Sequence, residues 1–135
     1  MKALGRHFIV ELYECDAELI NDTDAIKDVL LESVKISGAE IIRPVFHKFS
    51  PHGVTGIVVI AESHFSIHTW PEYGYCAFDI FTCGESIDNE RAIQYVREKL
   101  KARTISVAEI KRGLLNLPGE EIRYKPEDSK TGDSS

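Results

Sequence analysis

The stretch that decides the fold is GIVVIAESHFSIHTWPEYGYCAFDIFTC, residues 56–83. Residues 55–61 form a nearly continuous apolar run, which predicts a central strand covered on both faces. Residues 65–70 and 75–83 then alternate between two sets of side chains, as half-buried strands do. A proline and a glycine separate these two segments and mark a bend. The stretch therefore predicts three short strands in succession.

The alternation assigns the side chains of this stretch to two faces. In the first alternating segment, Phe65, Ile67 and Thr69 point one way. The opposite face carries Ser66, His68, Trp70 and, beyond the bend, Glu72. In the second segment one face carries Tyr75, Ala77, Asp79, Phe81 and Cys83. Ser63, the histidines that follow it and the Cys83 thiol thus lie on or beside short strands, where they could carry chemistry.

The N-terminal flank predicts a strand, a helix and a second strand. Residues 3–13 alternate, and residues 40–50 return to strand character with Pro44 inside, which suggests an edge position or a bulge. Between them, residues 21–24 offer N-cap candidates and Gly38 suits the C-terminal cap. The apolar stripe of this helix comprises Ile26, Val29, Leu30 and Val34.

The C-terminal flank predicts one more helix and one more strand. Ser86 or Asp88 can cap the helix, and residues 103–110 alternate weakly as a last strand. The buried stripe of the helix comprises Ala92, Ile93, Val96 and Leu100. From Gly113 onward the apolar pattern fades, and residues 125–135 have the composition of a disordered tail.

This order of elements favours an α+β fold, a two-layer α/β sandwich with a mainly antiparallel sheet and both helices on one face. The bare sheet face would expose apolar surface, so we expect a partner subunit to cover it. At 135 residues the chain is most simply one domain. We assign residues 1–112 to this domain and residues 113–135 to a C-terminal extension that is largely a disordered tail.

The composition excludes several classes of partner. A formal net charge of −6 argues against a nucleic-acid binder, which needs a basic surface. No run approaches about 18 consecutive apolar residues, so no membrane span is expected. The three cysteines, an odd number with no C-x-x-C pair, indicate a reducing compartment. The N-terminus lacks the apolar core of a secretion signal. We therefore expect a cytoplasmic protein.

The polar residues of the central stretch also have ordinary, non-catalytic interpretations. His64 and His68 are four apart, but on a strand this spacing separates them by about two steps of 6.7 Å, and no third metal ligand is well placed. We therefore predict no metal. Ser63 lacks the G-x-S-x-G elbow of a Ser-His-Asp hydrolase and could be a plain strand-end hydroxyl. Cys83 could be a small buried residue, the usual fate of a free cysteine.

The same residues also permit a different chemistry. A serine hydroxyl can attack the carbonyl of its own preceding residue when the peptide is strained and a proton shuttle is near. The amide becomes an ester, and removal of the serine α-proton then expels the upstream carboxylate. The serine remnant ends as a pyruvoyl group, which forms a Schiff base with an amine and acts as an electron sink, as pyridoxal phosphate does elsewhere.

Three segments carry a family resemblance: LGRHFIVELYEC (4–15), FHKFSPHGVTGIVVIAESH (46–64) and AESHFSIHTWPEYGYCAFDIFTCGE (61–85). The E-S-H, I-H-T-W-P-E and F-T-C-G elements appear in order. Together they resemble the prokaryotic S-adenosylmethionine decarboxylase proenzymes, the short, homodimeric, pyruvoyl-dependent class. The resemblance covers roughly residues 3–112. It implies conversion of S-adenosylmethionine to its decarboxylated form and CO2, which supplies aminopropyl groups for spermidine synthesis.

The resemblance implies roles for individual residues. Self-cleavage would fall between Glu62 and Ser63, and Ser63 would become the pyruvoyl group, with neither a metal nor pyridoxal phosphate. His68 would accept the α-proton during processing, a step suited to an imidazole near neutral pH. Cys83 would return a proton to the substrate after CO2 leaves. Thr55 stands where many members have serine, a position implicated in processing, and it keeps the hydroxyl.

The resemblance also implies a substrate pocket. Phe49 would stack on the adenine and Glu72 would bind the ribose hydroxyls. We include Trp70 because it shares a face with His68 and Glu72. The family's fold is a two-layer sandwich whose subunits place their sheets face to face, so the resemblance implies a homodimer of processed protomers, two fragments each, with pockets that use both subunits.

Two alternatives remain open from the sequence. Some relatives of this fold decarboxylate arginine with the same chemistry, although the implied adenine and ribose contacts argue against that substrate. The chain could also be an unprocessed, non-catalytic paralogue that has kept the pocket. The intact set of Ser63, His68 and Cys83 disfavours this second alternative.

Overall fold

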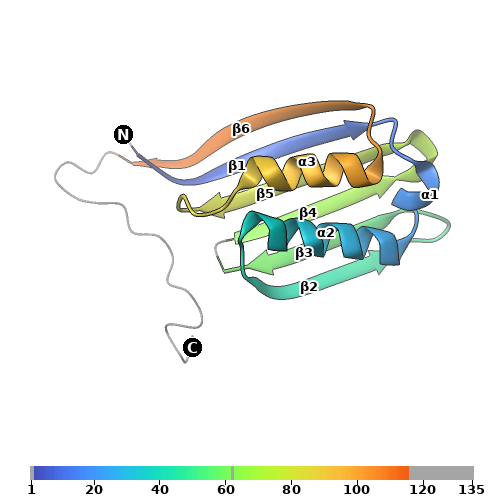
Figure 1. The fold of residues 1–135 in the computed structure, drawn as a ribbon, viewed down its shortest axis with the longest axis horizontal. Helices are drawn as coiled ribbons and strands as arrows, with labels where there is room; N and C mark the ends of the chain where they lie inside the picture. Colours follow the sequence, from blue (N-terminus) through green and yellow to red (C-terminus); the bar gives the residue numbers. More distant parts are fainter. Residues whose placement is uncertain (1, 62, 116–135) are drawn as a thin grey trace.

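The computed structural model describes residues 2–61 and 63–115 and contains one six-stranded sheet in the order β2-β3-β4-β5-β1-β6 (Figure 1). All neighbouring strands pair antiparallel. The strands are β1 (Lys2–Tyr13), β2 (Ile41–Lys48), β3 (Val54–Ile60), β4 (Ser63–Trp70), β5 (Tyr75–Cys83) and β6 (Thr104–Leu115). The helices are α1 (Ala17–Ile20), α2 (Thr23–Ser37), the 3-10 turn η1 (Pro71–Tyr73) and α3 (Asn89–Leu100).

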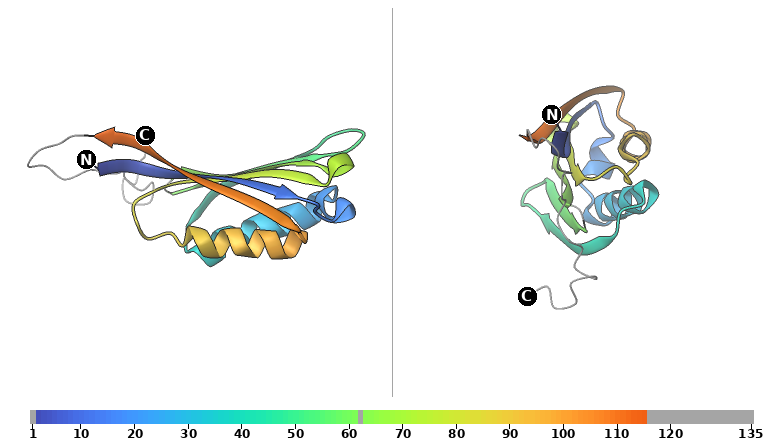
Figure 2. Two further views of the ribbon diagram at one scale, coloured as in Figure 1. Left: turned by 90° about the horizontal axis from the view of Figure 1, so that it is seen from above. Right: turned by 90° about the vertical axis from the view of Figure 1, so that its left-hand side faces the viewer.

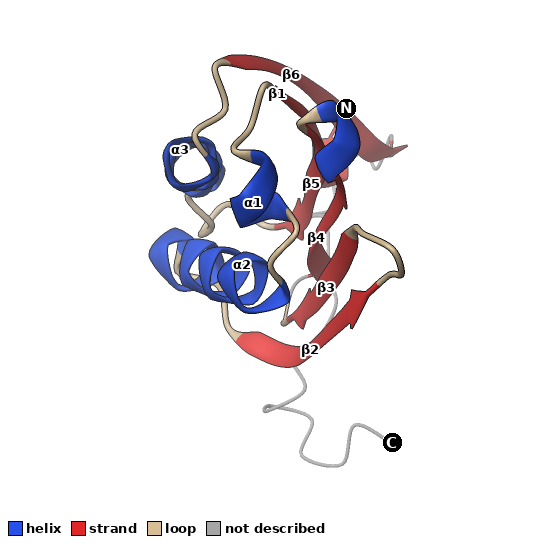
Figure 3. Ribbon diagram, turned by 90° about the vertical axis from the view of Figure 1, so that its right-hand side faces the viewer, coloured by secondary structure: helices blue, strands red, loops and turns tan. Residues whose placement is uncertain are grey.

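The molecule has two layers, because α1, α2 and α3 all lie on one face of the sheet (Figures 2 and 3). The expected two-layer α+β sandwich is thus confirmed. The core fills the space between the layers with buried aromatic and aliphatic side chains, of which the largest include Phe65, Phe78, Leu12, Leu30 and Leu100. Within residues 2–61 and 63–115, no helix is long and apolar enough to span a membrane.

Capping residues fix the ends of the helices. The Asp22 carboxylate accepts the backbone N–H groups of Asp24 and Ala25 at 3.0 and 3.2 Å, and Gly38 ends α2 with a φ of 89°. Asp88, one of the two expected caps, accepts from Arg91 N–H at 3.1 Å at the start of α3. The short α1 was not predicted, because its four residues are too few to show helical periodicity.

The sheet departs from the sequence prediction at β3 and β6 and agrees with it at β2. The expectation that β3 is covered on both faces is wrong for the single chain, because Ile57 and Val59 remain 39% and 41% exposed. The strand β2 lies at the sheet edge, as Pro44 suggested, and its register is irregular between Ile41 and Arg43. The strand β6 runs to Leu115, past the expected end at residue 110. Residues 116–135 of the expected tail lie outside the described residues.

The face without helices, called here the open face, is defined by the strand register. One row across it pairs His47, Thr55, His68, Ala77, Glu11 and Ser106. A second row pairs Val45, Ile57, Ser66, Asp79, Ile9 and Ala108. A third row pairs Arg43, Val59, His64, Phe81, His7 and Ile110. Polar groups in the middle of this face are therefore flanked by exposed aliphatic side chains on β2, β3 and β6.

Candidate active site

Ser63 and Cys83 meet at one end of the sheet, where β4 begins and β5 ends. Ser63 is the first residue of β4, Cys83 is the last residue of β5, and their Oγ and Sγ atoms lie 3.7 Å apart. Ser63 has a φ of 134°, which a side-chain-bearing residue rarely adopts, so the backbone is strained at this position. Glu62, the other half of the expected cleavage site, lies outside the described residues.

Thr55 and His68 form a second pair near the opposite end of β4. They face each other across the β3–β4 ladder, and Thr55 Oγ1 lies 3.0 Å from His68 Nδ1. When Nδ1 carries the imidazole proton, it donates to Thr55 Oγ1 and the lone pair is left on Nε2. Thr55 can therefore orient His68 as a base. The Thr55 hydroxyl, which the sequence assigned to a supporting role in processing, is the group that makes this contact.

The two pairs do not meet within one chain. Ser63 and His68 are five positions apart on the same strand. At about 3.3 Å per residue this corresponds to roughly 16 Å, far beyond hydrogen-bond reach. The structure thus brings Ser63 to Cys83, and Thr55 to His68, but it does not bring the expected processing base to the expected nucleophile.

The three expected substrate contacts lie at the His68 end of the sheet. Phe49 follows β2 and is exposed, with its ring 4.6 Å from the ring of His47. Trp70 ends β4 and packs on Tyr75 with ring centroids 5.3 Å apart. Glu72 lies in η1 and lines a cavity of about 400 Å³ together with residues of α1 and the β2–β3 turn.

His52 is a neighbour of Glu72 that the sequence reasoning missed. Its Nε2 lies 3.1 Å from Glu72 Oε1. The two residues come from different turns, the β2–β3 connection and η1, and both line the same cavity. No sequence signal pointed to His52, because a histidine between a proline and a glycine reads only as part of a turn.

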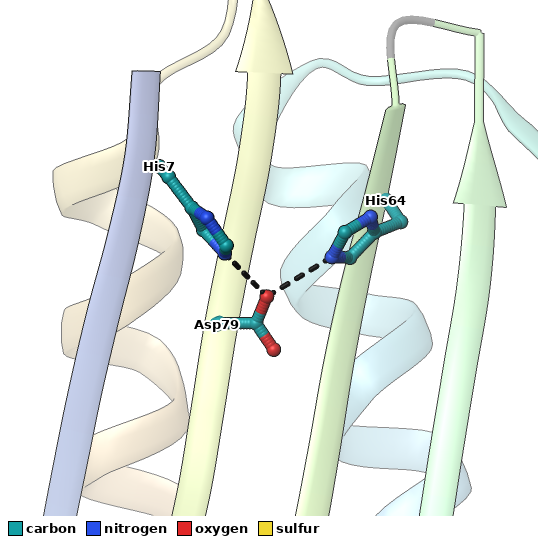
Figure 4. Close-up of side chains that lie close together, drawn as sticks. All are labelled: His7, His64 and Asp79. Carbon is teal, nitrogen blue, oxygen red and sulfur yellow. Dashed lines mark hydrogen bonds and ion pairs between the residues drawn. The ribbon is translucent and has the colours of Figure 1, made fainter. Parts of the chain in front are cut away.

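A third group on the open face, also missed, joins His7, His64 and Asp79 (Figure 4). The Nε2 atoms of His7 and His64 lie 2.7 and 3.0 Å from Asp79 Oδ2, and the Ser66 hydroxyl donates to Oδ1. Burial raises the pKa of Asp79, but the hydrogen bonds from His64, Ser66 and His7 outweigh it and lower this pKa to about 2. The carboxylate is therefore ionised at neutral pH.

The protonation of His7 shows how this group is held together. Arg112 Nη1 lies 3.2 Å from His7 Nδ1, and a guanidinium can only donate. His7 Nδ1 therefore accepts, and Nε2 carries the proton that goes to Asp79. The interpretation of His64 and His68 as a metal pair finds no support, because His64 bonds to Asp79 whereas His68 bonds to Thr55.

Comparison with known proteins identifies the family. The family model for S-adenosylmethionine decarboxylase matches residues 6–113. An S-adenosylmethionine decarboxylase proenzyme of Caldicellulosiruptor saccharolyticus is 53% identical over 118 residues, which cover 87% of this chain and 95% of that protein. One of Acetivibrio thermocellus is 49% identical over 118 residues, with the same two shares of 87% and 95%.

A solved structure agrees with these sequence relatives. The crystal structure of the adenosylmethionine decarboxylase from Aquifex aeolicus is 36% identical to this chain, covers 90% of it and 100% of that chain, and superposes with a TM-score of 0.82. The fold and the relatives define a decarboxylase. The chain belongs to the S-adenosylmethionine decarboxylase family, as its motifs indicated.

Proposed function

We propose that this chain is a proenzyme that cuts itself between Glu62 and Ser63 and then decarboxylates S-adenosylmethionine. The observation that carries the proposal is the conformation of Ser63. The only strained position within β4 is its first residue, and its hydroxyl faces the Cys83 thiol at 3.7 Å. Strain next to a bond that is to be broken lowers the barrier to breaking it.

Two steps break the chain, and a hydrolysis then completes the pyruvoyl group. Ser63 acts in the first step, and a base acts in the second. Ser63 Oγ attacks the preceding carbonyl carbon, the C–N bond breaks, and the nitrogen takes the hydroxyl proton, which leaves an ester. A base then removes the Ser63 α-proton, a carbon–carbon double bond forms, and the ester oxygen departs as the new carboxylate. Water hydrolyses the resulting enamine and ammonia leaves. His68, with Nδ1 held by Thr55, is the base that we propose.

We infer that His68 acts on Ser63 from a second copy of the chain. The separation of roughly 16 Å along β4 rules out the contact within one protomer. A twofold, face-to-face dimer would place the Ser63 end of one open face against the His68 end of the partner, because such an interface brings unlike parts of identical surfaces together. The exposed Val45, Ile57, Val59 and Ile110 supply apolar surface for this contact.

The same arrangement would complete the substrate site. The ketone formed from Ser63 supplies an electron sink as the substrate carboxylate leaves. Cys83, beside position 63, is placed to return a proton to the substrate α-carbon. From the partner, Phe49 offers an exposed ring for the adenine, Glu72 a carboxylate for the ribose hydroxyls, and Trp70 a further aromatic wall. Aromatic faces and carboxylates also suit a sulfonium cation.

The enzyme is proposed to work in the cytoplasm. Cys15, Cys76 and Cys83 are all free thiols. A catalytic thiol is retained most readily where the redox environment keeps cysteines reduced.

The test is the intact mass of the purified chain. Wild-type protein should separate into fragments 1–62 and 63–135, and the second should be lighter by one ammonia than a fragment that begins with serine. Ser63→Ala should give one uncut chain with no decarboxylase activity. Ser106→Ala, a serine on the open face of β6, is the matched control and should be cut like the wild type. Cleavage of Ser63→Ala at this bond would overturn the proposal.

A further inference from the structure

One carboxylate on the open face ties three strands together. Asp79 lies on β5 and accepts from His7 of β1 and from His64 of β4 (Figure 4). It also accepts from Ser66 of β4. His64 and Ser66 occupy alternate positions of β4 and so point to the same face. The carboxylate is ionised at neutral pH, and hydrogen bonds to an ionised acceptor are stronger than those between neutral groups.

The position of this cluster matters once the chain is cut. This step rests on the proposed function. Cleavage removes the covalent link between β3 and β4, so that β4 begins at position 63 with the reactive ketone at a loose chain end. A ketone in place of the serine also has no backbone N–H to donate to a neighbouring strand. His64 is then the first residue of the new chain that retains its N–H and an anchored side chain.

We propose that Asp79 is a positioning residue that holds the pyruvoyl-bearing end of β4 against β5 through His64 and Ser66, with His7 fixing the carboxylate from β1. The His64 peptide nitrogen is bonded directly to the acyl group of residue 63. Fixing the His64 ring therefore restrains the reactive carbonyl relative to the thiol of Cys83, which ends the same strand that carries Asp79.

The geometry favours a hydrogen-bond tether over a metal site. The ligand atoms of His7, His64 and Asp79 all lie within 4.8 Å of one another, which a metal ion could also use. The guanidinium of Arg112, however, donates to His7 Nδ1, so the proton of that ring sits on Nε2, the atom that faces Asp79. A metal ion would need the lone pair at that atom.

The experiment compares four variants of the full chain: Asp79→Asn, His64→Ala, His64→Gln and the double variant of the first two. His64→Gln keeps a side-chain N–H donor. Glu109→Gln is the control, because it also removes a carboxylate from an ion pair, here the 2.6 Å pair with Arg6. Glu109 lies on β6, which β5 and β1 separate from β4. Each protein is checked by circular dichroism, cut fragments are weighed, and kcat and KM are measured on cleaved enzyme.

The tether predicts a fall in kcat with little change in KM. Loosening the reacting carbon by an ångström can cost about 100-fold in rate, so Asp79→Asn and His64→Ala should each lower kcat by about that factor. The double variant should fall little further, because Asp79 acts through His64. His64→Gln should recover most of the loss. A larger share of the 63–135 fragment should begin with serine, because water reaches the ester before elimination.

Several results would overturn the tether. One is an Asp79→Asn variant whose kcat, KM and ketone content equal those of the wild type. Another is a His64→Gln variant as slow as His64→Ala, or a KM that rises while kcat stays constant. If added Zn²⁺ restored activity, or if a chelator removed it, the cluster would be assigned to a metal site instead. If the wild-type chain itself stays uncut, the proposed function fails, which is a different outcome from wild-type cleavage with unaffected variants.

Discussion

The two ends of the open face carry different residues, and we propose that each end supplies half of one active site. One end holds the strained Ser63 beside Cys83, the proposed nucleophile and the proposed acid. The other end holds His68, which contacts Thr55 and is the proposed base. Phe49 and Glu72 lie beyond it and are the proposed substrate-binding groups. In this proposal neither end alone carries out the reaction. One sheet face can supply a whole active site as two incomplete halves when two copies of the chain pack face to face in opposite directions.

Breaking the stacking should have the largest effect on this arrangement. Val59→Lys places a charge on the open face where Val59 is 41% exposed, and it should convert dimers to monomers. Because the halves would then no longer meet, self-cleavage should fall by 100-fold or more, on the order of the whole contribution of a general base. Analytical ultracentrifugation and a gel time course measure the two effects.

The control for that variant is Val107→Lys. Val107 is 48% exposed but pairs with the buried Val10, so it belongs to the helix-covered side of the sheet. It should leave both the dimer and self-cleavage intact. A monomeric Val59→Lys that still cuts itself at the wild-type rate would separate cleavage from dimerisation and contradict the two-half description.

A smaller effect is expected where the base half is weakened without being removed. Thr55→Val deletes the hydroxyl that lies 3.0 Å from His68 Nδ1, whereas Thr55→Ser keeps it. The valine variant should cut itself about tenfold more slowly, the loss expected when about 1.4 kcal/mol of hydrogen bonding is removed. The serine variant should match the wild type. Equal rates for the two variants would show that the hydroxyl does not act on His68.

The smallest effect concerns acid stability. Since the pKa of Asp79 is lowered to about 2 in the folded chain, its contribution to stability is present above the unfolded value near 4 and is lost as the pH falls toward 2. The melting temperature of the wild type should therefore exceed that of Asp79→Asn at about pH 5, and the gap should close near pH 2. A difference in melting temperature that stays constant between about pH 5 and pH 2 would show that ionisation of Asp79 does not stabilise the folded chain.

The six strands and the two long helices could be predicted because each carries a local signal, which the four-residue α1 does not. Alternation fixed β4 and β5, and Asp88 and Gly38 marked helix ends. The error at β3 has a physical origin, because an apolar run shows that both faces avoid water but does not show what covers them. In the single chain, helices cover one face, and the other, with Ile57 and Val59, is the face that we propose to meet a partner.

The site could be predicted only where a motif carried it. Ser63, Thr55, His68 and Cys83 came from a family pattern, and the structure groups them into two contacts. The cluster of His7, Asp79 and His64 could not be foreseen, because its members lie on β1, β5 and β4. Alternation placed Asp79 on a face with Cys83, but only the strand register shows that His7 of β1 and His64 of β4 lie on this same face.

The central claim, that each site joins Ser63 of one chain to His68 of another, is tested most directly by co-expressing two inactive variants. Ser63→Ala and His68→Ala should each remain uncut when expressed alone. In a mixed dimer, one site would combine the intact Ser63 of the His68→Ala chain with the intact His68 of the Ser63→Ala chain.

The measurement is the intact mass of both chains in the purified mixed dimer, distinguished by different affinity tags. The account predicts that the His68→Ala chain is cut at residue 63, that the Ser63→Ala chain stays whole, and that decarboxylase activity reappears. If both chains stay whole in a dimer of confirmed mixed composition, base and nucleophile belong to the same chain, and the two-half account is contradicted.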